Sequence, residues 1–133
     1  MPLSQQSTEF PKRVMFVIHS MRGGGSERQM SYLANEIASL AQTSLVTLDK
    51  TGNDAYPLDV RIERIGLNRT GTSGGLLKGS IANIRRIRSL RSQIRTWQPN
   101  VLVSFCDSTN ILSLMACPSN IPVLISEIGR AHV

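Results

Sequence analysis

The segment from Val14 to Arg28 constrains the fold of this 133-residue chain more than any other. It opens with a short apolar run, Val14–Ile18, and three consecutive glycines, Gly23–Gly25, follow shortly after it. An apolar pattern at helical spacing begins in the residues beyond. This succession predicts a buried strand, a glycine turn and the start of a helix.

The glycine turn has two interpretations. Glycines let the backbone come close to a ligand because no Cβ is in the way, and the N–H groups of the first helical turn attract an anion such as a phosphate or diphosphate. The alternative is a tight turn that only packs. The G-x-G-x-x-G fingerprint is incomplete after Gly25, and no Gly-Lys-Ser/Thr follows, so the local sequence leaves both interpretations open.

Along the rest of the chain, short apolar runs alternate with helical patterns. Strands are predicted over 13–18, 44–48, 60–65, 101–105 and 122–126, and helices over about 26–40, 76–97 and 109–116. This alternation is typical of an α/β protein with a Rossmann-like parallel sheet and helices on both faces. Ligands of such sheets bind at the carboxyl ends of the strands. The loops that begin near residues 20, 49, 106 and 126 therefore carry the candidate site.

Length and composition fit one globular domain, with 41% hydrophobic residues. Residues 1–12 read as a polar leader without the apolar core of a signal peptide. Cys106 and Cys117 have no metal-ligand spacing, and we expect reduced thiols. No apolar run approaches the ~20 residues of a membrane-spanning helix, so the expected location is cytoplasmic.

The net charge of +6 is concentrated in the second half of the chain, because no acidic residue lies between Glu63 and Asp107. On the predicted helix 76–97, isoleucines and leucines at helical spacing are expected to face the sheet. The remaining surface carries arginines that could contact an anionic membrane at the inner face, or could simply be solvated: Arg85, Arg88 and Arg91. Nucleic acid is not an expected partner, because only Trp97 offers an aromatic ring nearby.

In combination, these segments resemble the N-terminal domain of GT-B glycosyltransferases, specifically the retaining enzymes of family 4. FVIHSMRGGGSERQMSYLANEIA resembles the opening strand, the Gly-Gly-(Gly)-Ala-Glu-Arg loop and the first helix, with Ser26 where alanine is common. SLVTLDKTGNDAYPLDVRIERIGL resembles the second and third strands. The long helix, the strand VLVSF and the strand within IPVLISE complete the likeness, and Trp97–Asn100 departs only mildly from the usual Lys-Pro-Asp-Val strand start.

The resemblance implies a hexosyltransferase of glycan biosynthesis, which moves a sugar from a nucleotide-sugar donor to a lipid-linked or glycan acceptor. The favoured donor is UDP-linked, and no further cofactor and no metal are expected. The residues expected to face the donor diphosphate and sugar are Gly23, Gly24, Gly25 and Glu27. The residues expected on the acceptor side are His19, Asp107, Ser108 and Asn110. Glu27 and Asn110 could instead serve only their helices, and His19 could be packed.

The resemblance also implies a missing half. Residues 13–126 would form an incomplete acceptor-side domain, and the donor-binding domain of the family has no counterpart in the sequence. Residues 127–133, EIGRAHV, leave the family pattern and are expected to be a non-native tail. The chain alone is then expected to be inactive, with catalytic residues unassigned. The alternative function is a non-catalytic α/β module that binds a nucleotide or another phosphorylated ligand.

Overall fold

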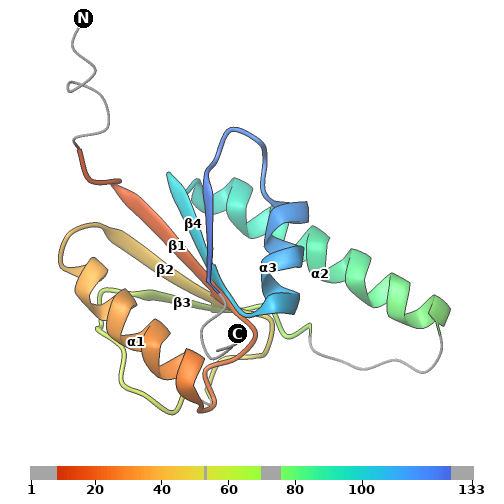
Figure 1. Cartoon of the computed structure of the whole chain (residues 1–133), viewed down its shortest axis with the longest axis horizontal. Coiled ribbons are helices and arrows are strands. Elements are labelled where there is room, and N and C mark those ends of the chain that lie inside the picture. The colour runs from red at the N-terminus through yellow and green to blue at the C-terminus, as the bar shows by residue number, and fades with distance from the viewer. Residues whose placement is uncertain (1–8, 53, 70–75, 127–133) are drawn as a thin grey trace, which may run out of the picture.

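The computed structural model describes residues 9–52, 54–69 and 76–126, with the backbone alone for 76–80, 107 and 108. Within these residues, strands and helices alternate along the chain (Figure 1). In chain order they are β1 (Arg13–Ile18), α1 (Gly25–Ala38), β2 (Gln42–Thr47), β3 (Glu63–Gly66), α2 (Leu76–Trp97), β4 (Val101–Phe105), α3 (Asp107–Ala116) and β5 (Val123–Ser126). The predicted leader lies mostly outside the described residues. The predicted tail, 127–133, lies outside them entirely.

The strands form one sheet in the order β3-β2-β1-β4-β5, and every neighbouring pair is parallel. In the central pairs, Phe16 of β1 lies opposite Leu45 of β2 and Val103 of β4. The predicted Rossmann-like α/β sheet is confirmed. Because all strands run the same way, their carboxyl ends meet at a single edge.

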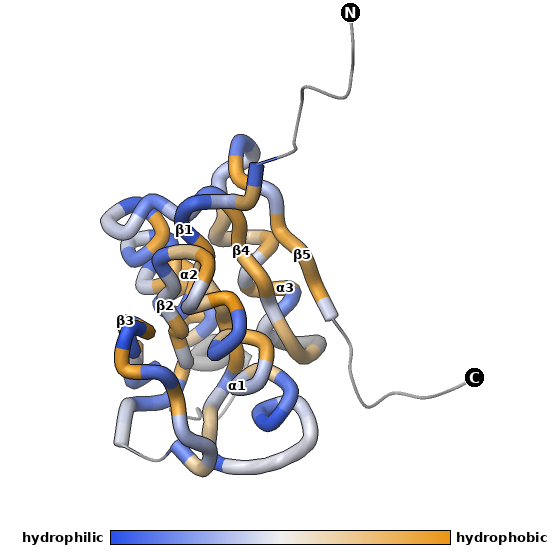
Figure 2. Tube along the Cα trace, turned by 90° about the vertical axis from the view of Figure 1, so that its left-hand side faces the viewer, coloured by the Kyte–Doolittle hydropathy of each residue, from blue (hydrophilic) through white to orange (hydrophobic). Residues whose placement is uncertain are grey.

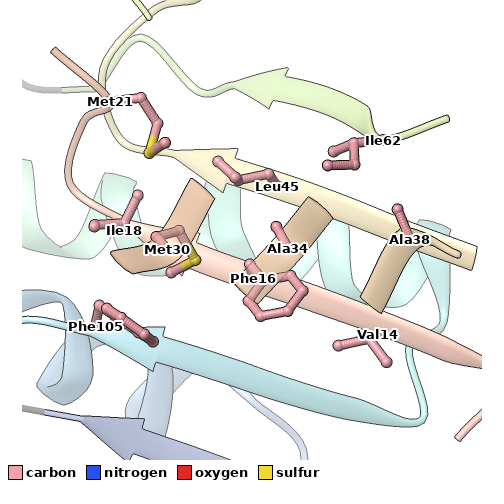
Figure 3. Close-up of a cluster of buried hydrophobic side chains, with 10 residues drawn as sticks. All are labelled: Val14, Phe16, Ile18, Met21, Met30, Ala34, Ala38, Leu45, Ile62 and Phe105. Atoms are coloured by element: carbon pink, nitrogen blue, oxygen red, sulfur yellow. The ribbon is translucent and has the colours of Figure 1, made fainter. Parts of the chain in front are cut away.

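Alternate residues of β1 supply the two hydrophobic cores, because successive side chains of a strand point to opposite faces. Val14, Phe16 and Ile18 pack on the α1 face, where Figure 3 shows them gathered with Met30 and the other buried side chains of that cluster. Met15 and Val17 belong to the second core, under α2 and α3. Helices therefore cover both faces, as predicted, and the apolar strands β4 and β5 stand out in Figure 2.

Helix α1 is buried through a narrow stripe of small side chains and one methionine. Met30, Ala34 and Ala38 are fully or almost fully buried, whereas Tyr32, and Leu40 just beyond the helix, are more than half exposed. Small residues allow the helix to lie close to the sheet, so the larger apolar residues of the helical pattern remain at its surface.

A polar network closes the opposite edge of the sheet, where the strands begin. The Asn100 Oδ1 accepts hydrogen bonds from the Lys12 and Arg13 backbone N–H groups, at 3.1 and 2.8 Å. The Arg13 guanidinium lies 4.0 Å from the centre of the Trp97 ring, and the Trp97 indole N–H donates to Glu63 at 2.9 Å. Asn100 thus joins the start of β1 to the start of β4.

The predicted third strand begins too early. Val60, a residue type that favours strands, is 98% exposed, and β3 begins only at Glu63. Asp59 forms a local turn instead, because its carboxylate accepts from the Arg61 N–H and its carbonyl accepts from the Ile62 N–H. Local side-chain hydrogen bonds of this kind compete with strand pairing.

The predicted apolar face of α2 is only partly buried. Leu90 and Ile94 are buried, but Ile81 and Ile84 are 42% and 51% exposed. The reason is length: a 22-residue helix spans about 33 Å, whereas the six-residue strand β1 spans about 20 Å. The first half of α2 therefore runs beyond the sheet, as Figure 1 shows.

Candidate functional site

The glycine loop connects β1 to α1 at the carboxyl edge of the sheet. Gly23 and Gly24 have φ angles of +147° and +143°, which residues with a side chain rarely adopt. Gly25 is different: it begins α1 without a positive φ, and a Cβ built there would meet nothing within 4 Å. The first two glycines therefore shape the loop, and the third leaves open space in front of the helix N-terminus.

The segment between β2 and β3, residues 48–52 and 54–62 in the structure, holds this loop in place and is called the connector below. The Ala55 N–H donates to the Met21 carbonyl at 2.7 Å, and Met21 itself is buried. The Tyr56 hydroxyl lies 3.4 Å from the Gly24 nitrogen and 3.3 Å from the Gly24 oxygen. Hydrogen bonds therefore hold the glycine loop against the connector.

The connector is itself anchored to β3. Arg64 makes a two-point ion pair with Asp54, at 2.9 and 3.0 Å. At the end of β3, a Cβ on Gly66 would lie 2.6 Å from the Thr51 nitrogen and 2.9 Å from the Asp49 oxygen. Because these are backbone atoms, the close approach of residues 49–51 to β3 requires glycine at position 66.

Asp49 and Arg22 form an ion pair between the connector and the glycine loop. The Arg22 Nε donates to the Asp49 Oδ2 at 2.7 Å; the aspartate side chain is only 6% exposed, whereas the arginine side chain is 61% exposed. The Asp49 Oδ1 accepts from the Lys50 N–H at 2.8 Å. The hydrogen bond from Arg22 lowers the pKa of the Asp49 carboxyl, although burial opposes that change. The carboxylate is therefore ionised at neutral pH.

Sequence reasoning missed both partners of this pair. Asp49 directly follows the predicted second strand, and Arg22 directly precedes the glycines. Charged residues at the ends of predicted strands indicate a functional site. Their contact could not be predicted, because it joins residues 27 positions apart and depends on the parallel pairing of β1 with β2.

Glu27 lies at the glycine loop, as its predicted role requires. A Cβ on Gly24 would be 2.7 Å from the Glu27 Oε1, so the carboxylate covers this part of the loop. The side chain makes no capping hydrogen bond, although its charge suits the first turn of a helix. A donor contact for Glu27 stays a prediction.

The predicted acceptor-side residues lie at the same edge of the sheet but differ in their surroundings. His19 is exposed, and its carbonyl accepts from the Asp49 N–H at 3.0 Å. Asp107 and Ser108 begin α3, and their side chains lie outside the described residues. Asn110 is 4% exposed and donates to the Ser126 carbonyl at 3.2 Å. It therefore ties α3 to β5, and its Oδ1 has no partner among the described residues.

Cys106 forms the junction between β4 and α3 in an unusual conformation. Its φ is +82°, and its N–H donates to the Ser126 carbonyl at 3.1 Å. A residue with a side chain rarely adopts this φ, so the β4–α3 turn is strained at the edge where the other loops meet.

The three predicted membrane-facing arginines have different roles. Arg91 donates to the Met115 and Ala116 carbonyls at 3.0 and 3.3 Å and so caps the C-terminus of α3. Arg85 and Arg88 are exposed on the outer side of α2. Within the described part of the chain, no helix combines the length and apolarity needed to cross a membrane.

An open apolar groove lies between α1 and the strands β4 and β5, with a volume of about 490 Å³. Tyr32 and Leu33 line it from α1, and Leu124 and Ile125 line it from β5. Its lining is mostly apolar, so it offers packing surface rather than groups for the recognition of an anion.

No family model matches this chain, and comparison with known proteins finds a similar glycosyltransferase. The relative is an α-1,4-N-acetyl-D-galactosaminyltransferase of Campylobacter jejuni, whose name gives GalNAc-α-(1→4)-GalNAc-α-(1→3)-diNAcBac-PP-undecaprenol as the substrate. The two sequences are 25% identical over 116 residues, which cover 86% of this chain. The chain is thus related to a glycosyltransferase, and it spans 32% of that relative's length.

Gly24 and Gly25 differ in backbone conformation, so alanine at the two positions should change the free energy of unfolding by different amounts. Gly24→Ala places a Cβ on a residue with φ +143°, and we expect it to lower the free energy of unfolding by about 1–3 kcal/mol. Gly25→Ala, the matched control, adds a Cβ in open space at a helical residue and should change stability by less than about 1 kcal/mol. Urea unfolding of the three proteins measures both values. Equal losses for the two variants would contradict the described loop conformation.

Proposed function

We propose that this chain is the acceptor-side, N-terminal domain of a retaining GT-B glycosyltransferase of family 4. The complete protein would transfer a hexose-type sugar from a UDP-linked donor to a lipid-linked or glycan acceptor. The observation that carries the proposal is the fastened glycine loop at the carboxyl edge of a β3-β2-β1-β4-β5 parallel sheet, in a chain related to a glycosyltransferase.

The glycine loop suits the diphosphate of a nucleotide sugar. Negative charge develops on the diphosphate as the sugar leaves it, and fixed N–H groups with a helix dipole stabilise such charge without reorganising. The open side of Gly25 gives the diphosphate access to the start of α1. Glu27 suits a different part of the donor, because a carboxylate repels phosphate and accepts hydrogen bonds from sugar hydroxyl groups.

The acceptor would lie beside the β4–α3 turn. Of the two predicted acceptor-side residues whose side chains the structure describes, His19 is exposed and Asn110 is buried. The start of α3 offers backbone N–H groups to the acceptor. Asn110 would act indirectly, by holding α3 against the end of β5. The groups that clamp the donor and promote transfer would belong to the rest of the protein, since this chain spans 32% of its relative.

Sugar transfer by the protein expressed from its complete reading frame tests the proposal. The assay follows radiolabelled sugar from UDP-N-acetylhexosamines and UDP-hexoses into lipid-linked acceptors in membranes. We expect transfer by the wild type, at least a hundredfold less with Gly24→Val because its side chain crowds the diphosphate (about 2.7 kcal/mol or more), and normal transfer with Asn83→Ala. Absence of transfer from every donor would contradict the proposal.

Titration of the 133-residue chain distinguishes the proposed half-domain from a self-sufficient binding module. We expect weak or no binding of UDP-sugars, because one side of a cleft binds only part of its ligand. Micromolar affinity that is lost in Gly24→Val would favour the binding module instead. Urea unfolding of the variant shows whether it remains folded.

We also propose that the outer side of α2 contacts the anionic surface of a membrane that carries the acceptor. Arg85 and Arg88 are exposed there, and the half-exposed Ile81 and Ile84 lie on the same helix. An exposed arginine contributes about 1 kcal/mol close to anionic lipids. Arg91 is also exposed on this helix, and it donates to the Met115 carbonyl at the end of α3.

Flotation with vesicles containing phosphatidylglycerol tests the membrane contact. Arg85→Gln/Arg88→Gln should reduce the bound fraction severalfold, because two charges near the lipid surface are lost. Arg61→Gln/Lys12→Gln removes the same charge from the opposite edge of the sheet and should bind like the wild type. Equal binding by both double variants would rule out the α2 surface.

A further inference from the structure

Arg22 is an exposed cation held by a buried anion. Its Nε is bonded to Asp49, and the rest of its guanidinium, with both Nη nitrogens, has no partner among the described residues. Burial of a carboxylate is costly unless hydrogen bonds compensate for lost water. Asp49 receives this compensation from Arg22 and from the Lys50 N–H. The pair differs from an ordinary surface ion pair, in which both side chains are free to move.

Asp49 is itself held rigidly. Its N–H donates to the His19 carbonyl at 3.0 Å, and its carbonyl accepts from the Thr47 hydroxyl at 2.8 Å. Because Gly66 has no side chain, the Asp49 carbonyl can lie against β3. The position of the carboxylate is therefore fixed by β1, β2 and β3 together, and Arg22 takes its orientation from that carboxylate.

Asp49 holds this guanidinium at the carboxyl edge of the sheet, where the glycine loop also lies. Arg22 directly precedes Gly23 and Gly24, whose conformation is fixed by the connector. A guanidinium presents paired N–H groups that match the oxygens of a phosphate. The Glu27 carboxylate near Gly24 would repel a diphosphate, and a cation such as Arg22 would offset that repulsion.

We propose that Arg22 binds a phosphate of a diphosphate at the glycine loop and that Asp49 is its positioning residue. The inference rests on the proposed function and adds to it the cation that recognises the diphosphate. Two sources have this chemistry: the nucleotide-sugar donor and a polyprenyl diphosphate acceptor.

Nuclear magnetic resonance of the 133-residue chain, titrated with inorganic pyrophosphate at constant ionic strength, tests the inference. We expect saturable shifts of the loop amides and of the Arg22 Nε–H signal, with millimolar affinity. Arg22→Gln should weaken binding about tenfold, because a hydrogen bond to a charged group is lost. Asp49→Asn should weaken binding severalfold in the wild type but not in the Arg22→Gln background, because it acts through Arg22.

Arg61 and Asp59 provide the matched control. Arg61 is 58% exposed and is paired with Asp59 at 2.8 Å, but it lies in a groove at the opposite edge of the sheet with Lys12 and Gln42. Arg61→Gln and Asp59→Asn should leave pyrophosphate binding unchanged. If Arg61→Gln and Arg22→Gln weakened pyrophosphate binding equally, the effect would come from net charge alone, and the inference would be overturned.

The remaining outcomes separate this inference from the proposed function. Loop shifts that are unaffected by Arg22→Gln overturn the role of Arg22 and leave diphosphate binding by the glycines intact. No saturable shift at the loop also overturns the inference, while sugar transfer by the complete protein still decides the proposed function. Parallel titrations with UDP and with farnesyl diphosphate show whether the diphosphate belongs to the donor or to the acceptor. The source is the ligand that binds more tightly to the wild type and loses more affinity in Arg22→Gln.

Discussion

Parallel pairing of all five strands is the constraint on which the rest of the structure depends. It brings the ends of β1, β2, β4 and β5 to one edge, and it places two charged residues, 27 positions apart in the sequence, in contact. Buried apolar residues from both faces of β1 hold this arrangement together. The candidate site is thus a consequence of the sheet, because each of its segments begins where a strand ends.

The glycine loop is shaped by its neighbours more than by its own sequence. Gly66 lets the β2–β3 connector approach the sheet, Asp54 anchors the connector through Arg64, and Ala55 and Tyr56 then bond to the loop. A loop fixed in this way loses little conformational entropy when it binds a ligand. Such preorganisation is compatible with the proposed binding of a diphosphate.

Much of the fold could be predicted from the sequence, because apolar runs and helical spacing report local structure directly. The bounds of β1, β4 and α2 agree with the prediction. The errors arose where local chemistry or length overrode the pattern: the Asp59 turn delays β3, and α2 runs beyond the sheet. The predicted glycines lie at the expected edge, but the Arg22–Asp49 pair was missed because side-chain contacts across strands cannot be read from spacing.

The glycine loop owes its conformation to hydrogen bonds from the connector between β2 and β3. Hydrogen exchange at the Ala55 amide measures this directly, because that N–H is bonded to the Met21 carbonyl of the loop at 2.7 Å. The described structure predicts exchange at least a hundredfold slower than in an unstructured peptide, or about 2.7 kcal/mol of protection or more. Exchange at the rate of an unstructured peptide would contradict a loop that is formed before its ligand binds.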